Sequence, residues 1–95
     1  MKFDISVQRN NIIGNDIDIR VEAEGDEVIV SVDYILDGFN LDTDNFNDTP
    51  LNSLRRTFSQ AGDARPGKQH RLIVKVHGKP GSPDKNGSRV WTDLN

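Results

Sequence analysis

The sequence predicts an all-β fold, a small antiparallel β-sandwich, and three observations carry this prediction. Hydrophobic and polar residues alternate with a period of two over several stretches, as they do in half-buried strands. Short turn-forming clusters, such as Asp37-Gly38, separate these stretches. The chain has 95 residues, of which 34% are hydrophobic, so it can build one core. We therefore expect a single domain over residues 1–95.

The longest alternating stretch, Ile17–Leu36, is predicted to form a β-hairpin. Its middle holds Gly25-Asp26, a Gly-first pair that suits a tight two-residue turn. Closing the hairpin there sets Val21 opposite Val30 and places only apolar pairs along one face. A slip of one residue would mix apolar and polar residues on both faces, which fixes the register.

The other expected elements follow from the same patterns. Alternation predicts strands, and Gly, Pro and Asn predict turns. The predicted segments are a first strand at Lys2–Gln8, a short edge strand or loop at Phe39–Asp48, a strand at Gln69–His77, a loop at Gly78–Ser88 and a last strand at Arg89–Thr92.

The segment Thr49–Gly62 has two interpretations. Its first two residues are an N-cap type and a proline suited to a first helical turn, which favours a helix over Pro50–Ala61. It is also compatible with a strand if Arg56 shares a face with Leu54 and Phe58. The helix would make the fold α+β, an antiparallel sheet with one packed helix.

Four runs resemble the back half of bacterial immunoglobulin-like domains. They are Leu36–Gly38, Arg56–Gly62, His70–Val76 and Arg89–Asp93, within a region of similarity from Glu27 to Asp93. The resemblance implies an immunoglobulin-like sandwich of short strands, and it favours an extended Arg55–Ser59. Two features depart from that family's pattern: the Gly25-Asp26 hairpin joins strands that usually lie in different sheets, and the helix signals have no counterpart.

Composition excludes several classes of function. The absence of cysteine excludes disulfides, zinc–thiolate sites and a thiol nucleophile. No apolar run is long enough for a transmembrane helix, so no membrane partner is expected. The compartment depends on context: cytoplasmic if the chain is complete, extracellular or virion-associated if it is an excised domain.

Charge is unevenly distributed along the chain. Met1–Thr49 holds three basic and twelve acidic residues, a net of −9, whereas Pro50–Asn95 holds nine basic and three acidic residues, a net of +6. Two interpretations remain open. The halves form separate charged surfaces, which would steer a partner or let molecules meet head to tail, or strands from the two halves interleave.

Acidic residues suggest two weak sites. Asp42 and Asp44 have the one-residue spacing of oxygen ligands in a calcium loop, and Asn47 and Asp48 offer further oxygen ligands, but the pattern lacks the glycine and final glutamate of an EF-hand. In the predicted hairpin Asp18 and Asp33 lie opposite each other, where like charges are unfavourable and two carboxylates could do acid–base chemistry. A flat exposed face offers no pocket for that chemistry, so no catalytic residue is predicted.

No cofactor is expected either. His70 and His77 lie seven residues apart on one predicted strand, hence on opposite faces, and cannot share a metal ion. No phosphate-binding glycine loop is present.

The expected function is a non-catalytic protein-binding or structural module. The alternatives are a small free-standing inhibitor or immunity-type protein with one protein partner, and a calcium-binding or small hydrolytic domain. Nucleic acid is not expected as a partner, because the net charge is acidic and the basic residues lack interleaved aromatics. The candidate partner-binding residues are charged or outward-facing apolar residues: Asp16, Asp18, Asp33, Ile29, Ile35, Arg55, Arg56, Arg71 and Ile73.

Overall fold

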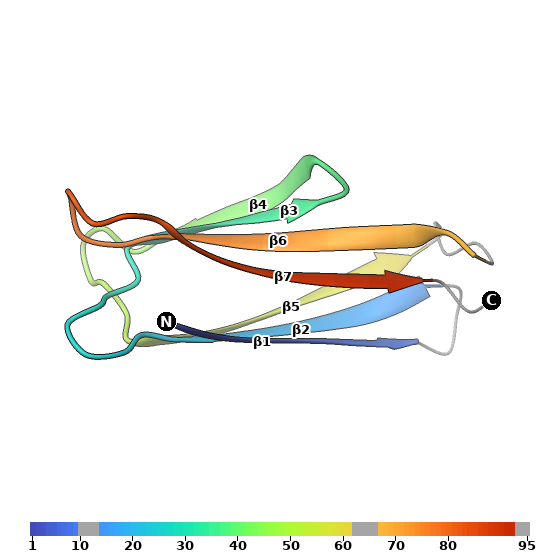
Figure 1. Cartoon of the computed structure of the whole chain (residues 1–95), viewed down its shortest axis with the longest axis horizontal. Coiled ribbons are helices and arrows are strands. Elements are labelled where there is room, and N and C mark those ends of the chain that lie inside the picture. The colour runs from blue at the N-terminus through green and yellow to red at the C-terminus, as the bar shows by residue number, and fades with distance from the viewer. Residues whose placement is uncertain (10–13, 62–66, 93–95) are drawn as a thin grey trace.

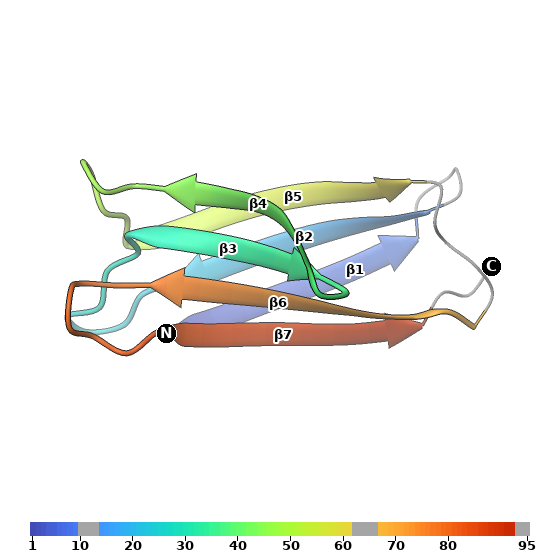
Figure 2. The same ribbon diagram turned by 90° about the horizontal axis from the view of Figure 1, so that it is seen from above.

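The computed structural model describes residues 1–9, 14–61 and 67–92, which form two antiparallel β-sheets packed face to face (Figures 1 and 2). No helix occurs among these residues, and therefore none with the length and apolar character to cross a membrane. The seven strands are β1 (Lys2–Arg9), β2 (Gly14–Glu22), β3 (Ser31–Leu36), β4 (Phe39–Asn45), β5 (Ser53–Ala61), β6 (Gln69–His77) and β7 (Lys85–Thr92). The order is β1-β2-β5 in one sheet and β4-β3-β6-β7 in the other. The predicted all-β sandwich is confirmed.

The core lies between the sheets, and alternation along the strands supplies it. Every second residue of the central strands points inward, so burial alternates along β2, β3 and β6. The buried hydrophobic residues form one cluster: Ile5, Ile17, Ile19, Val21, Ile29, Val32, Tyr34, Leu36, Leu72, Val74 and Val76.

The predicted Ile17–Leu36 hairpin is wrong. β2 pairs with β1 and β5, whereas β3 pairs with β4 and β6, so residues 23–30 cross from one sheet to the other. Val21 therefore pairs with Phe3 and Leu54 rather than with Val30. Alternation specifies which face of each strand is buried. Two such faces can meet across a core as well as side by side in one sheet.

In the crossing segment, the residues that point inward are not the ones that the predicted alternation places there. Ile29, expected on the outer face, is fully buried. It forms an isolated antiparallel bridge with Leu51, and the next amide, that of Val30, donates to the carbonyl of His77 (2.9 Å). The inward phase resumes as predicted at Val32.

Residues 53–61 are extended, which confirms the extended Arg55–Ser59 and rules out the alternative of a helix over Pro50–Ala61. β5 pairs with β2 along its whole length, so every residue of the strand has a cross-strand partner. A short isolated helix in the same place would be only marginally stable. Leu54, Arg56 and Phe58 are all half-buried, and the two hydrophobic members pack against the core. The strand interpretation required this shared face.

The two edge strands of the larger sheet refine the remaining predictions. Phe39–Asn45 is a strand, β4, with a register shift opposite Tyr34/Ile35. The predicted loop Gly78–Ser88 is too long, because β7 begins at Lys85, which pairs with Val76.

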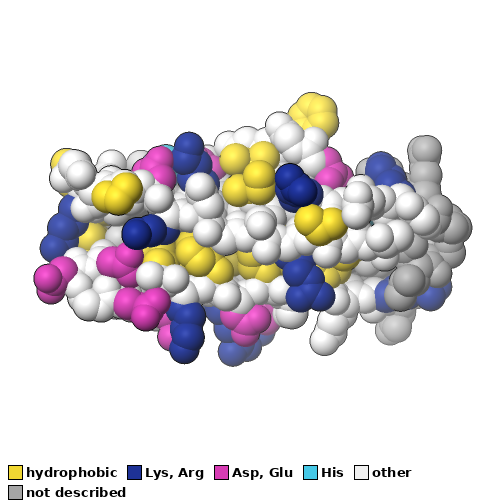
Figure 3. All heavy atoms as spheres, viewed as in Figure 1, with side chains coloured by type: hydrophobic (Ala, Val, Ile, Leu, Met, Phe, Trp, Pro, Cys, Tyr) yellow, Lys and Arg dark blue, Asp and Glu magenta, His cyan; other side chains and the backbone are white. Residues whose placement is uncertain are grey.

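The two open sides of the sandwich are closed differently. On one side β1 lies beside β7, and Figure 3 shows hydrophobic side chains along this seam. Gly87 makes the close approach possible, since a Cβ there would lie 2.4 Å from Cγ of Phe3. Arg89 adds a hydrogen bond from Nη1 to the carbonyl of Ile5 (3.1 Å). On the other side, charged residues of β4 and β5 connect the sheets.

Candidate functional site

The charge asymmetry along the sequence does not persist as two charged surfaces. Acidic β2 lies beside basic β5, and acidic β3 lies beside basic β6. Asp18, Asp33, Asp37, Asp42 and Asp44 of the first half contact bases or histidines of the second half. Interleaving of the two halves is therefore the correct interpretation.

The outer face of the three-stranded sheet is polar throughout the described residues. Its outward-facing side chains are Lys2, Asp4, Ser6 and Gln8 of β1, Asp16, Asp18, Arg20 and Glu22 of β2, and Ser53, Arg55, Thr57 and Ser59 of β5.

Within that face, Asp18 is the centre of an ion-pair cluster. Arg20 and Arg55 are direct cross-strand partners, an unfavourable pairing of like charges that Asp18 relieves. Arg55 contacts both carboxylate oxygens of Asp18, from Nε at 3.1 Å and Nη2 at 3.3 Å. This hydrogen bonding lowers the pKa of Asp18. Asp16, another predicted site residue, accepts a hydrogen bond from the Ser59 hydroxyl (3.0 Å).

Two of the candidate calcium ligands already contact an internal cation. Arg56 reaches from β5 to β4, where Nη2 contacts Asp42 and Nη1 donates to Asp44 (2.6 Å). The hydrogen bond from Arg56 lowers the pKa of Asp42. The guanidinium carbon also lies 4.7 Å from the ring centroid of Phe58 and 5.6 Å from that of Tyr34.

The Arg56 cluster continues into the core through Tyr34. The Tyr34 hydroxyl donates to Asp44 (2.8 Å), and burial, followed by this hydrogen bond, raises the pKa of Tyr34 well above its ordinary value. Asp48, the third candidate, is exposed in the β4–β5 connection. In the part of the chain that the structure describes, no three acidic or histidine side chains are grouped as a metal site.

His77 connects β3 to the β6–β7 connection on the outer face of the four-stranded sheet. Its Nε2 lies 3.0 Å from Asp33, and its Nδ1 lies 2.9 Å from Asp84. Thr43 also donates to Asp33 (2.7 Å). The hydrogen bond to Asp33 is the main cause of the raised pKa of His77, and the same contact lowers the pKa of Asp33. The cluster therefore favours a protonated imidazolium between two carboxylates.

His70 lies on the opposite face of β6, as the spacing predicts, with its side chain fully buried. Its Nδ1 is 2.6 Å from Asp37, and its ring lies 5.5 Å from that of Trp91. Asp37 also accepts from the Arg71 amide (2.8 Å). Burial acts to raise the pKa of Asp37, but these two hydrogen bonds outweigh it, so the pKa is lowered.

An apolar strip crosses the outer face of the four-stranded sheet. It consists of Ile35, Ile73 and Val90, on the adjacent strands β3, β6 and β7. Ile35 and Ile73 are direct cross-strand partners and half-buried, and Val90 is 42% exposed. Arg71 is the cross-strand partner of Val90 and borders the strip.

The predicted site residues are thus divided among four places. Ile35, Ile73 and Arg71 come together on one outer face, and Asp33 lies on the same face. Asp16, Asp18 and Arg55 lie on the outer face of the other sheet, Arg56 lies between the sheets, and Ile29 lies in the core. Sequence reasoning missed Val90, whose alternation with Trp91 was the available signal.

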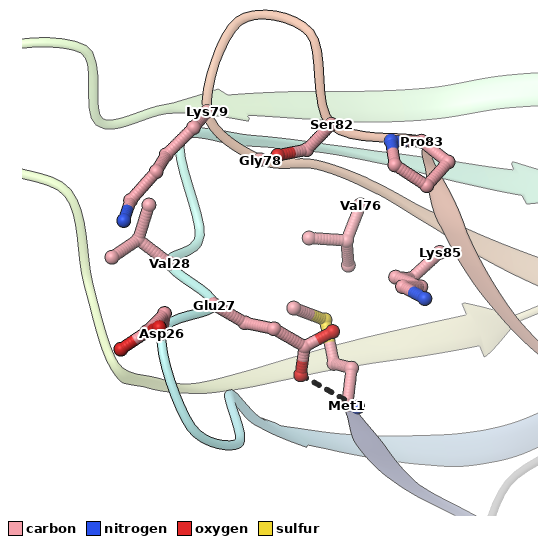
Figure 4. A pocket seen from close by; sticks show the side chains of 10 residues that line it. All are labelled: Met1, Asp26, Glu27, Val28, Val76, Gly78, Lys79, Ser82, Pro83 and Lys85. Atoms are coloured by element: carbon pink, nitrogen blue, oxygen red, sulfur yellow. Dashed lines mark ion pairs between the residues drawn. The ribbon is translucent and has the colours of Figure 1, made fainter.

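Sequence reasoning also missed a pocket of about 230 Å³ at one end of the sandwich (Figure 4). It lies between the β2–β3 crossing and the β6–β7 connection, far apart in the sequence. Val28 and Val76 supply apolar surface, and the charged side chains of the lining are Asp26, Glu27, Lys79 and Lys85. Met1 also lines the pocket, and its N-terminal ammonium lies 2.7 Å from the Glu27 carboxylate (Figure 4).

Comparison with known proteins adds no assignment: no protein-family model, curated protein or solved structure matches this chain.

Proposed function

We propose that this chain is a non-catalytic, immunoglobulin-like protein-binding module that meets its partner with the outer face of the four-stranded sheet. The observation that carries the proposal is the apolar strip of Ile35, Ile73 and Val90. It lies on one outer face, whereas the outer face of the other sheet is polar throughout the described residues. Apolar patches rimmed by polar groups are typical of protein interfaces.

The rim suits a protein partner better than a small molecule. Arg71 borders the strip on one side, and Asp33 and Lys75, a cross-strand pair, border it on the other. A flat strip with mixed charges provides the water-excluding centre and polar margin of an interface.

Strand topology supports the immunoglobulin-like part of the proposal. Immunoglobulin-like sandwiches place their second and fifth strands in one sheet and the strands called C, F and G in the other. The orders β1-β2-β5 and β4-β3-β6-β7 have this division. Both departures from the family pattern, the hairpin and the helix, are absent from the structure.

The His77 cluster does not favour a general base at this position. Both ring nitrogens contact carboxylates, and this environment raises the pKa of His77. A general base needs an unprotonated nitrogen directed at the substrate, and this arrangement favours the opposite state.

Affinity capture with matched surface variants tests the proposal. Val90→Arg places a charge on the strip, and Thr57→Arg places the same charge on the polar face of the other sheet. Both positions are exposed, so both variants should fold, which circular dichroism would check. We expect one protein from an extract of the source cells to be retained by the wild type and by Thr57→Arg, but not by Val90→Arg.

Direct binding of that purified protein, measured by calorimetry, should show the same pattern. Equal retention by all three forms, or no retained protein, would overturn the proposed surface.

A further inference from the structure

β5 forms one edge of the three-stranded sheet, and the edge that faces away from β2 is unpaired among the described residues. The nine residues of β5, Ser53–Ala61, pair with β2 in one continuous register. No other described strand pairs with β5. Figure 2 shows β5 along the margin of its sheet, where its second half extends beyond β4 of the other sheet. The backbone groups along such an edge can hydrogen-bond an added strand.

The other three edge strands of the described sheets are each protected. β1 and β7 lie side by side, and Gly87 allows the ring of Phe3 to approach β7 closely. β4 has a register shift opposite Tyr34/Ile35, and an irregular edge pairs poorly with an added strand. β5 is regular and uncovered, so its edge is the one best suited to association.

The charges beside β5 suit a second copy of the same strand. On the outer face of the sheet, Arg20 and Arg55 share the carboxylate of Asp18. Asp16 lies further along β2 and accepts a hydrogen bond from Ser59 of β5. On the two strands nearest the edge, the row through Arg55 is therefore basic and the row through Ser59 is acidic. This order is complementary to itself when a second strand runs in the opposite direction.

One antiparallel register uses this order. Side chains of the same face must lie opposite each other, so the two-fold axis of such a pair passes through a residue of β5. An axis through Arg55 or Arg56 would set two arginines directly opposite each other, which is unfavourable. An axis through Thr57, the middle residue of β5, pairs the whole strand. It sets Arg55 of each copy opposite Ser59 of the other.

We propose that two copies of this chain form a dimer by pairing their β5 strands antiparallel about Thr57, which joins their three-stranded sheets into one. Each Arg55 then lies between Asp18 of its own copy and Asp16 of the other. At the axis the two Thr57 side chains lie opposite each other, a favourable pairing in antiparallel sheets. The contact is isologous and uses the β5 edge of each copy, so the assembly is closed.

The dimer leaves the proposed binding surface accessible. Its two-fold axis is perpendicular to the sheets, so the outer faces of the two four-stranded sheets remain exposed, with their strips of Ile35, Ile73 and Val90. The inference therefore goes beyond the proposed function and does not depend on it.

Two arginine substitutions distinguish the β5 edge from the rest of the sheet. Thr57→Arg places two arginines opposite each other at the axis and should prevent pairing. Ser6→Arg is the matched control, because Ser6 and Thr57 are the two cross-strand neighbours of Asp18 and both are exposed. Ser6 lies on β1, away from the β5 edge. Circular dichroism would check that both variants fold.

Sedimentation velocity over a concentration series is the first test. The wild type and Ser6→Arg should shift from the monomer mass toward the dimer mass as the concentration rises, and no larger species should form. Thr57→Arg should remain monomeric at every concentration that makes the wild type dimeric.

Single cysteines test the register, because the chain has no cysteine of its own. In the dimer the Cβ atoms of the two Thr57 residues are about 4.5–5.5 Å apart, so Thr57→Cys should form a covalent dimer under mild oxidation. Ser53→Cys is the control on the same strand and face, because the two Ser53 residues lie roughly 27 Å apart at about 3.4 Å per residue. This pair of variants decides the question if Thr57→Arg folds poorly.

Any of five results would overturn the inference: a wild type that stays monomeric throughout the series, a Thr57→Arg that dimerises as readily as the wild type, a Ser6→Arg that does not dimerise, species larger than a dimer, or cross-linking of Ser53→Cys as efficient as that of Thr57→Cys. Loss of partner capture in Val90→Arg bears only on the proposed function, which can fail or succeed independently.

Discussion

Replacing Arg56 with alanine should lower the free energy of unfolding, because Arg56 connects the two sheets on the side closed by β4 and β5. Arg56 is the only described side chain that contacts both Asp42 and Asp44, and its guanidinium carbon also lies 4.7 Å from the ring centroid of Phe58. The substitution leaves two neighbouring carboxylates without their counter-charge. Asp44 is the more costly one, because its side chain is only 19% exposed.

The magnitude follows from these contacts. A hydrogen bond to a charged group contributes about 1.5–3 kcal/mol when buried, and a cation–π contact adds about 0.5–1 kcal/mol. The Arg56 and Asp42 side chains are 31% and 45% exposed, so solvent screening reduces the ionic part substantially. We expect Arg56→Ala to lower the free energy of unfolding by about 2–3 kcal/mol, or the melting temperature by about 10–20 °C for a domain of this size.

Arg55→Ala is the matched control. Arg55 is the preceding residue, carries the same group and also pairs with an aspartate, Asp18, but its side chain is 62% exposed on the outer face. Exposed ion pairs contribute about 0–1 kcal/mol, so urea unfolding should show a small effect for Arg55→Ala and a large one for Arg56→Ala. Equal losses in the two variants, or a loss below about 0.5 kcal/mol for Arg56→Ala, would refute the reasoning.

Three further predictions concern other parts of the fold. The pKa of His77 in the folded protein is raised above its ordinary 6.5, so its contribution to stability should be complete below about pH 6.5 and lost as the pH rises through the folded-state pKa. The urea midpoints of the wild type and His77→Gln, measured across pH, should therefore converge on the alkaline side. Parallel curves would contradict this. Gly87→Ala should cost about 1–3 kcal/mol because the new methyl meets the ring of Phe3, whereas Ser88→Ala, at an exposed neighbour, should cost little in the same assay. Calorimetry should detect no calcium binding tighter than about millimolar, because Arg56 already contacts the Asp42 and Asp44 carboxylates. Micromolar binding that is abolished by Asp42→Asn would contradict this expectation.

Alternation predicted which face of each strand is buried but not which strands pair with each other. Ile17, Ile19 and Val21 are buried as predicted, and so are Val32 and Tyr34. The hairpin prediction failed because a period of two carries no information about whether the facing residues belong to one sheet or to two. Long-range pairing decides that question, and a single sequence holds little of it beyond charge.

The β5 strand shows a different limit. Thr49-Pro50 gave a sound helix-start signal, and the same residues are equally compatible with a turn before a strand. The choice between helix and strand depended on Arg56, a charged residue that must share the inner face with Leu54 and Phe58 if the segment is a strand. It tolerates the inner face because Asp42 and Asp44 of the opposite sheet meet it there. That compensation depends on how β4 and β5 approach each other, which local sequence does not specify.

The distribution of charge indicated that the predicted hairpin was unfavourable. The predicted register set Asp18 opposite Asp33, a pairing of like charges across two strands. In the structure Asp33 lies opposite Lys75, and Asp18 is next to Arg55 on β5. Because the first half of the chain is acidic and the second half basic, opposite charges favour the two pairings that join the halves, β2 with β5 and β3 with β6, over β2 with β3. The other three pairings, β1 with β2, β3 with β4 and β6 with β7, lie within one half, so the charge split bears on only part of the strand order.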